Sequence, residues 1–187
     1  FTNRDSSISE KEAIEKTLFL FEQAVNRQLV SDVPVGSYLS GGMDSGSIVG
    51  VASRSIPRIS TFTCGFDMSA TTGREANFDE RRDAELMASF FKTEHFEQVI
   101  NAGDLAWSMP RLIYHLEDLR VGMSYPNYYI SRLASRFVKV CLSGAGGDEL
   151  YGGYPWRYYH VFKSLDSNSF FKDYYSFWQR LVADEEK

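Results

Sequence analysis

Two short glycine-containing segments carry the side chains that could do chemistry, and the first is residues 39–45, which read Leu-Ser-Gly-Gly-Met-Asp-Ser. A hydrophobic run precedes it and small residues follow it, a pattern typical of a strand, a tight turn and the start of a helix. The adjacent glycines let the backbone come close to a ligand, and the peptide N–H groups of the helix start favour an anion. The two serines add hydroxyl donors. Asp44 would repel a phosphate unless a cation such as Mg2+ lay between them, so the segment predicts a metal-bridged polyphosphate such as MgATP.

This first segment is not a Walker loop, because no lysine follows the glycines and the spacing is shorter. The letters SGGMDS instead resemble the SGGxDS loop of the N-type ATP pyrophosphatases. Those enzymes cleave ATP between its α- and β-phosphates and leave AMP on the substrate. A tight strand-to-helix turn with incidental serines is the alternative interpretation.

The second segment is residues 143–149 (Ser-Gly-Ala-Gly-Gly-Asp-Glu), which also follows an apolar run, residues 138–142. Strands that alternate with helices imply a parallel sheet, and such sheets bind ligands beyond the carboxyl ends of their strands, where the strand order reverses. We therefore expect the two segments to meet there, with Asp44 and Asp148 facing one ligand.

The hydrophobic pattern places both segments in an α/β fold, a doubly wound parallel sheet with helices on both faces. Strands are expected at residues 35–39, 59–64, 95–100 and 138–142, the second ended by Gly65. Helices are expected at residues 9–30, 45–53, 79–91, 106–116 and 128–136. A Ser9–Glu12 capping box and an Asp79 cap begin two of these helices, and Pro110 weakens another. Residues 67–77 and 117–127 are expected to be irregular.

Two helices carry apolar stripes: that of the first helix is expected to pack inward on the sheet, and that of the helix at residues 79–91 is expected to face inward. The stripe of the first helix consists of Ile14, Leu18, Phe21, Val25 and Leu29. That of the helix at residues 79–91 consists of Ala84, Leu86, Met87 and Phe90.

The second segment and its continuation, LSGAGGDELYGGYP, resemble the SGxGxDE-[LVI]-[FY]-GGY signature of asparagine synthetases. With DVPVGxxLSGGxDS before it, the close match is the synthetase domain of the glutamine-dependent, class B enzymes. That domain has the adenine nucleotide alpha hydrolase-like (PP-loop ATPase) fold. The resemblance covers residues 31–156, including residues 78–80, 83–85 and 93–95, and the two glycine motifs together are specific.

The resemblance implies an ATP-dependent amide-forming reaction. The aspartate β-carboxylate attacks the α-phosphorus of MgATP, giving β-aspartyl-AMP and pyrophosphate, and ammonia released from glutamine then displaces AMP. A carboxylate is a poor electrophile at neutral pH, and adenylation turns its oxygen into a good leaving group.

The resemblance also implies roles for individual residues. Pyrophosphate would be cradled by Ser40, Gly41, Gly42, Asp44 and Ser45. Catalysis and Mg2+ binding would fall to Asp44 and Asp148, and the adenylate would lie near Ser143 and Gly144. Leu39 would touch the nucleoside, and strand residues 62–65, Cys64 among them, would meet adenine through backbone groups.

One departure from the family pattern is Ala145, where the family usually has an acidic residue between the first two glycines of the second segment. It removes a possible proton acceptor or ammonia-orienting group. Two alternatives therefore stay open: a β-lactam-type synthetase or another carboxylate-adenylating sister enzyme, and a nucleotide-binding module without turnover.

Other polar side chains have simpler interpretations. Asp148 and Glu149 could be helix-capping acids. We expect packing roles for Tyr151 and Tyr154, and structural or surface roles for His95 and His115. Glu117 and Asp118 are weak candidates for the substrate side, since Leu119 replaces the family's usual proline.

The composition is that of a globular protein of about one domain: 187 residues, 43% of them hydrophobic, with a formal charge of -5. This charge argues against broad nucleic-acid binding, and no apolar run reaches the roughly 20 residues that span a bilayer. A cytoplasmic setting is expected. Cys64 and Cys141 fall in predicted strands and indicate core thiols. Residues 1–187 are expected to be a partial synthetase domain, whose parent carries a glutaminase domain and a further C-terminal segment and could form a homodimer.

Overall fold

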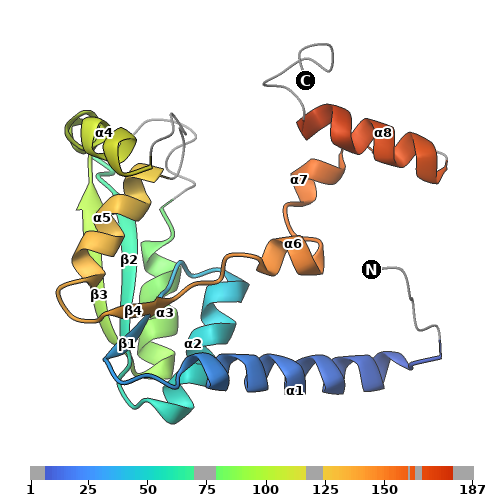
Figure 1. The fold of residues 1–187 in the computed structure, drawn as a ribbon, viewed down its shortest axis with the longest axis horizontal. Helices are drawn as coiled ribbons and strands as arrows, with labels where there is room; N and C mark the ends of the chain where they lie inside the picture. The colour runs from blue at the N-terminus through green and yellow to red at the C-terminus, as the bar shows by residue number, and fades with distance from the viewer. Residues whose placement is uncertain (1–6, 70–78, 117–123, 160, 163–165, 179–187) are drawn as a thin grey trace. The chain divides into compact units, whose positions relative to one another are not determined.

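A computed structural model describes residues 7–69, 79–116, 124–159, 161–162 and 166–178. The chain divides into two compact units, Phe1–Gly144 and Ala145–Lys187, and each is described by itself. Figure 1 shows the first unit as a sheet with helices around it.

The strands of the first unit are β1 (Val35–Tyr38), β2 (Ser60–Phe66), β3 (Glu94–Ile100) and β4 (Val140–Leu142). Its helices are α1 (Glu10–Gln28), α2 (Met43–Ser55), α3 (Arg81–Phe91), α4 (Ala102–Leu116) and α5 (Ser124–Ala134). Each predicted strand and helix up to β4 is present, which confirms the alternation inferred from the sequence.

The four strands form one parallel sheet in the order β3-β2-β1-β4. The chain builds outward from β1 through β2 to β3, then returns to place β4 on the other side of β1. The strand order therefore reverses between β1 and β4. Loops that leave the carboxyl ends of these two strands flank the position where such sheets bind ligands.

Alternate residues of the strands pack against helices on opposite faces of the sheet. Phe62 packs with Ile130 and Ala134 of α5, whereas Leu39, next to β1, packs with α2 and α3. Figure 1 shows α3 and α5 on the two sides of β2. The doubly wound arrangement predicted from the sequence is confirmed.

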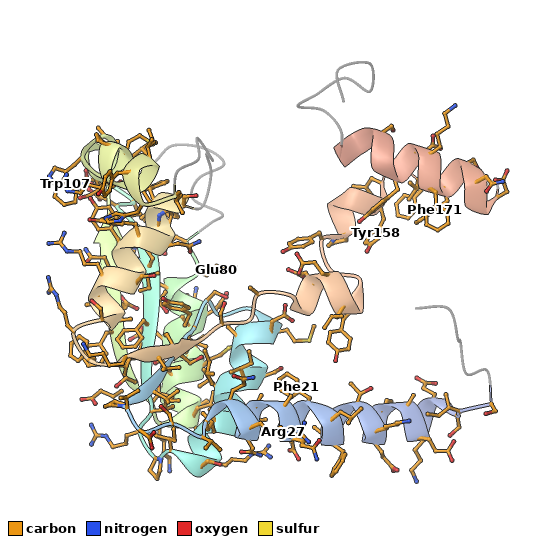
Figure 2. The ribbon with its side chains drawn as sticks, in the orientation of Figure 1. Phe21, Arg27, Glu80, Trp107, Tyr158 and Phe171 are labelled. Carbon is orange, nitrogen blue, oxygen red and sulfur yellow. The ribbon has the colours of Figure 1, made fainter. Side chains whose placement is uncertain are left out.

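Helix α1 begins as predicted, with Ser9 and Glu12 bonded in a capping box. Its second half packs on α2 and on Ile59, the residue before β2: Val25 is buried with Val51 of α2 and Ile59, and Figure 2 labels Phe21 on this part of the helix. The inward prediction is wrong for Ile14 and Leu18, which are exposed.

Helix α3 packs through its small residues, because Ala84 and Ala88 are buried beneath α2 and β1. The inward prediction is wrong for Leu86 and Phe90, whose side chains are 62% and 80% exposed. They line a groove of about 840 Å³ between α1, α2 and α3, which Leu18 and Met43 also line.

Several predicted boundaries are wrong. Gly65 does not end β2, which continues to Phe66. The N-cap of α3 is Glu80, not Asp79 as predicted, although the Asp79 carboxylate accepts from the amide of Arg81, the first residue of the helix. The prediction of irregular backbone is wrong for residues 124–127, which begin α5, while residues 117–123 lie outside the described residues. Helix α4 starts four residues earlier than predicted and runs through Pro110.

Both cysteines are free, partly buried thiols, as predicted. Burial raises the pKa of Cys64 to about 11 and that of Cys141 to about 12, so both thiols are protonated at neutral pH. His95 is largely buried and bonds to Thr61, whereas His115 is exposed at the end of α4. No helix in the described part of the chain combines the length and apolar character needed to cross a membrane.

The second unit contains three helices in its described residues: α6 (Gly147–Tyr151), α7 (Pro155–Tyr158) and α8 (Ser167–Trp178). Tyr158 of α7 stacks on Tyr174 of α8, which in turn stacks on Phe170. Figure 2 labels Tyr158 and Phe171 in this unit.

Candidate active site

The loop after β1 is held by hydrogen bonds among its own residues. The Ser45 hydroxyl accepts from the Ser40 amide at 3.1 Å, contacts the Ser40 hydroxyl at 3.0 Å and donates to the Gly42 carbonyl at 3.2 Å. The Ser40 hydroxyl also accepts from the Gly42 amide at 3.3 Å. Ser45 is buried and Ser40 is exposed, so Ser45 holds the loop from its buried side while Ser40 lies at its surface.

The start of α2 faces this loop without a side-chain cap. Gly42 is the N-cap and makes no side-chain cap bond. Because the first N–H groups of an α-helix have no partner within the helix, this end presents unpaired donors and a positive dipole end. The first turn also carries Asp44. The arrangement is suited to a polyphosphate with a cation beside it.

Gly41 needs to be glycine for two reasons. Its φ of +80° lies in the left-handed region that disfavours a side chain. A Cβ there would also lie 2.7 Å from the Asp83 Cβ and 3.0 Å from the Ala84 amide nitrogen. The loop therefore rests directly on the first turn of α3, near Glu80, which Figure 2 labels.

The loop after β4 reaches the same place. A Cβ on Gly144 would lie 2.9 Å from the Ser45 amide nitrogen and 3.0 Å from the Asp44 Cβ. Only a glycine lets the backbone after β4 come this close to the first turn of α2. The structure thus brings together residues 40–45 and Gly144, beside the reversal of strand order.

Leu39 and Cys64, expected on the nucleoside side, come from neighbouring strand ends. Leu39 is buried, its amide donates to the Phe62 carbonyl at 3.0 Å, and its carbonyl accepts from the Thr63 hydroxyl. The Cys64 side chain packs on the α5 face of the sheet. Any contact of Cys64 with a ligand in the loops would therefore come from its backbone.

Asp44 is half-buried between the two loops, and its carboxylate has no hydrogen bond or ion pair to the rest of the described chain. Among the described residues, no group of three or more acidic, histidine or cysteine side chains could enclose a metal. One carboxylate beside serine hydroxyls fits Mg2+, which is usually held by one or two carboxylates together with waters and substrate phosphates.

Asp148 lies in the second unit, in the first turn of α6, and its carboxylate lies against Gly153. The N-cap of α6 is Gly146, so the capping interpretation of Asp148 and Glu149 is wrong. Glu149 instead accepts from the Tyr154 hydroxyl at 3.3 Å. The meeting of Asp148 with Asp44 stays a prediction, as do the roles of Ser143 and Ala145.

No local sequence pattern predicted the support beneath the first loop. Asp83 and Ala84 lie under Gly41, and Thr63 binds the Leu39 carbonyl. A further missed feature is the Asp79–Arg81 pair, in which N–O distances are as short as 2.6 Å. An aspartate two residues before an arginine was the available signal for this pair. Glu117, Asp118 and Leu119 lie outside the described residues.

A comparison with known protein families decides which family these loops belong to. The family model described as asparagine synthase matches residues 16–185, which include both loops. The chain belongs to the asparagine synthase family. This confirms the resemblance identified from the two glycine motifs.

Curated relatives in this family are longer than the chain. It is 38% identical over 132 residues to asparagine synthetase [glutamine-hydrolyzing] 1 of Bacillus subtilis, covering 70% of this chain and 20% of that protein. It is 35% identical over 147 residues to a putative asparagine synthetase of Methanocaldococcus jannaschii, covering 77% and 27%. The chain therefore spans between a fifth and a third of the relatives it matches.

A solved structure of NMN synthetase from Francisella tularensis is similar at 16% identity and a TM-score of 0.46, covering 79% of this chain and 59% of that one.

Proposed function

We propose that this chain is the ATP-binding part of a glutamine-dependent asparagine synthetase. In this reaction an oxygen of the aspartate β-carboxylate attacks the α-phosphorus of ATP, and the bond to pyrophosphate breaks. Ammonia from glutamine then attacks the acyl carbon, AMP leaves with the bonding electrons, and the nitrogen loses a proton to give asparagine.

The observation that carries the proposal is the contact between Gly144 and the first turn of α2, because it brings the start of the second motif against the first motif, beside the strand-order reversal. Membership of the asparagine synthase family supports the same reaction class.

Each part of the proposed site has a physical task. The uncapped start of α2, with Gly41 and Gly42, would cradle the β- and γ-phosphates that leave as pyrophosphate. Ser40 and Ser45 would fix the loop so that its donors are in place before the charge develops. Ser143 and Gly144 would lie beside the adenylate, and Leu39 and the backbone at Cys64 beside the nucleoside.

Asp44 and Asp148 would hold Mg2+, which stabilises the negative charge that builds on the departing pyrophosphate. We further propose a glutaminase domain in the same parent chain, a homodimeric assembly and a cytoplasmic setting.

The test is pyrophosphate release by the full-length protein with ATP, Mg2+ and aspartate. Release that depends on aspartate, with asparagine formed when glutamine or ammonia is added, is the expected result. Other carboxylic acids run in parallel would detect a sister enzyme such as a β-lactam-type synthetase, which Ala145 keeps open.

If no acid supports pyrophosphate release, both enzyme hypotheses are rejected. Calorimetric binding of ATP without turnover would then identify a nucleotide-binding module. If the protein neither binds ATP nor turns it over, the proposed site is rejected.

A further inference from the structure

Arg81, the first residue of α3, joins that helix to the end of β2. Its Nε donates to the Asp79 Oδ1 at 2.8 Å and its Nη2 to the Asp79 Oδ2 at 2.6 Å. Nη2 also donates to the Phe66 carbonyl at 3.1 Å. The guanidinium fork thus ties the last residue of β2 to the segment that enters α3, a geometry that only arginine supplies.

The surroundings of Arg81 are built to fit this side chain. Its aliphatic stem lies across Gly65, where a Cβ would be 2.3 Å from the Arg81 Cδ and Nε. The Asp79 and Arg81 side chains are only 10% and 26% exposed. The hydrogen bonds from Arg81 lower the pKa of the Asp79 carboxyl, so the pair is ionised at neutral pH. A glycine inside a strand marks such a close approach.

The same turn of α3 supports the first glycine loop. Gly41 lies against Asp83 and Ala84, two and three residues after Arg81. Glu80, the N-cap of α3, makes no side-chain cap bond. Within the described residues this end of the helix is held by the Arg81 side chain and by the Asp79 carboxylate, which also accepts from the Arg81 amide at 3.3 Å. A displacement of the α3 start would therefore move the surface on which Gly41 rests.

We infer that Arg81 is a positioning residue, which with Asp79 fixes the start of α3 and thereby holds the residue 40–45 loop in the geometry for pyrophosphate departure. This inference rests on the proposed function. A misplacement of about 1 Å at a reacting group costs about 100-fold in rate. The effect of losing Arg81 should fall on kcat more than on the KM for ATP, because alignment matters most in the transition state.

The experiment measures aspartate-dependent pyrophosphate release by the full-length protein and four variants. In Arg81→Lys the stem over Gly65 and the charge stay but the fork is lost, and we expect kcat to fall about 100-fold with the KM for ATP within about threefold. The kcat of Asp79→Asn should fall by a similar factor. The kcat of the double variant should be no lower than that of Arg81→Lys, since the effects of residues that act as a unit are not additive.

Arg82→Lys is the matched control, because Arg82 is the exposed next residue and makes no hydrogen bond or ion pair with the described residues. It should retain the wild-type kcat. Thermal unfolding of each variant separates positioning from folding, because a positioning loss persists at temperatures where the variant is fully folded.

Wild-type kcat in Arg81→Lys, or an additive loss in the double variant, would overturn the inference. A loss that disappears on cooling below the unfolding transition would do the same, since Arg81 would then serve stability alone. If the unmodified protein releases no pyrophosphate, the proposed function fails, and that outcome is distinct from a failure of Arg81.

Discussion

The two glycine loops have similar letters but differ in how the structure holds them. Residues 40–45 lie wholly in the first unit, cross-linked by Ser45 and supported by α3. The second segment starts in the first unit, where Gly144 packs on Ser45, and continues from Ala145 in the second unit. The first loop is thus pre-formed by its own neighbours, while the part of the second that carries Asp148 belongs to a separate body.

Their glycines differ as well. Gly41 requires both a left-handed φ and an empty Cβ position, whereas Gly144 requires only the empty position. Gly146 has a φ of +102° with open space around it. Steric approach therefore constrains Gly144 and backbone conformation constrains Gly146, and only Gly41 is subject to both.

The largest expected effect tests whether the aspartates of the two loops share a metal. Asp44→Asn should lower kcat for pyrophosphate release by about 1000-fold, because a neutral amide is a poor Mg2+ ligand. Its free energy of unfolding should stay within about 0.5 kcal/mol of wild type, since the carboxylate makes no contact that an amide would break. Asp148→Asn should lower kcat by the same order. Both variants should shift the Mg2+ dependence of pyrophosphate release in the same way. A normal Mg2+ dependence in Asp148→Asn would show that the second loop carries no metal ligand.

The second prediction separates the two glycines by stability. Gly41→Ala should lower the free energy of unfolding by roughly 3 kcal/mol, since it combines a left-handed φ with overlap onto the backbone of α3. Gly144→Ala should cost roughly 1–2 kcal/mol, because its overlap with Ser45 can be relieved by moving the end of β4. Urea unfolding of both variants measures the difference. Equal losses would mean that α3 does not constrain the first loop more than α2 constrains the second.

The order of elements and both loops could be predicted because their signals are local. The capping box at Ser9 and the glycine motif of residues 39–45 depend on residues a few positions apart, and both are observed. The start of α4 was not predicted although its signal is local too: the Asn101 side chain accepts from the Gly103 amide, and the Asp104 carboxylate accepts from the Asn101 amide.

Other features depend on partners distant in sequence. Gly65 was expected to end a strand, but it lies inside β2. The side chain that it lacks would occupy the space of the Arg81 stem. Phe90 fits the helical stripe of α3, yet the sheet is covered by Ala84 and Ala88, which lets the backbone approach closely. Residues 124–127 were expected to be irregular, but they begin α5. Pro126 lies in its first turn, where the N–H that proline lacks would have no partner within the helix. No local pattern reveals which of these alternatives packing selects.

The third prediction tests the internal cross-link of the first loop. Ser45→Ala should lower the free energy of unfolding by about 1–2 kcal/mol, because the partly buried hydrogen bond from the Ser40 amide loses its acceptor. Ser40→Ala should cost about 0.5 kcal/mol, as Ser40 is exposed and water can replace its hydroxyl. Urea unfolding of the two variants compares them directly. If Ser40→Ala costs as much as Ser45→Ala, the loop is not held chiefly from its buried side.

The smallest expected effect is a pH dependence that belongs to the scaffold rather than to either loop. Burial lowers the pKa of His95 below its ordinary value of 6.5, and the nearby Glu97 and Glu85 oppose this only in part. The unfolded chain therefore takes up a proton at a higher pH than the folded one, so this residue's contribution to stability is present at neutral pH and lost as the pH falls below 6.5. In His95→Gln the loss of stability between pH 7 and pH 5 should be smaller than in wild type. Urea unfolding of both proteins across this pH range measures the difference. An unchanged acid dependence in His95→Gln would show that the pKa of the imidazole does not differ between the folded and unfolded states.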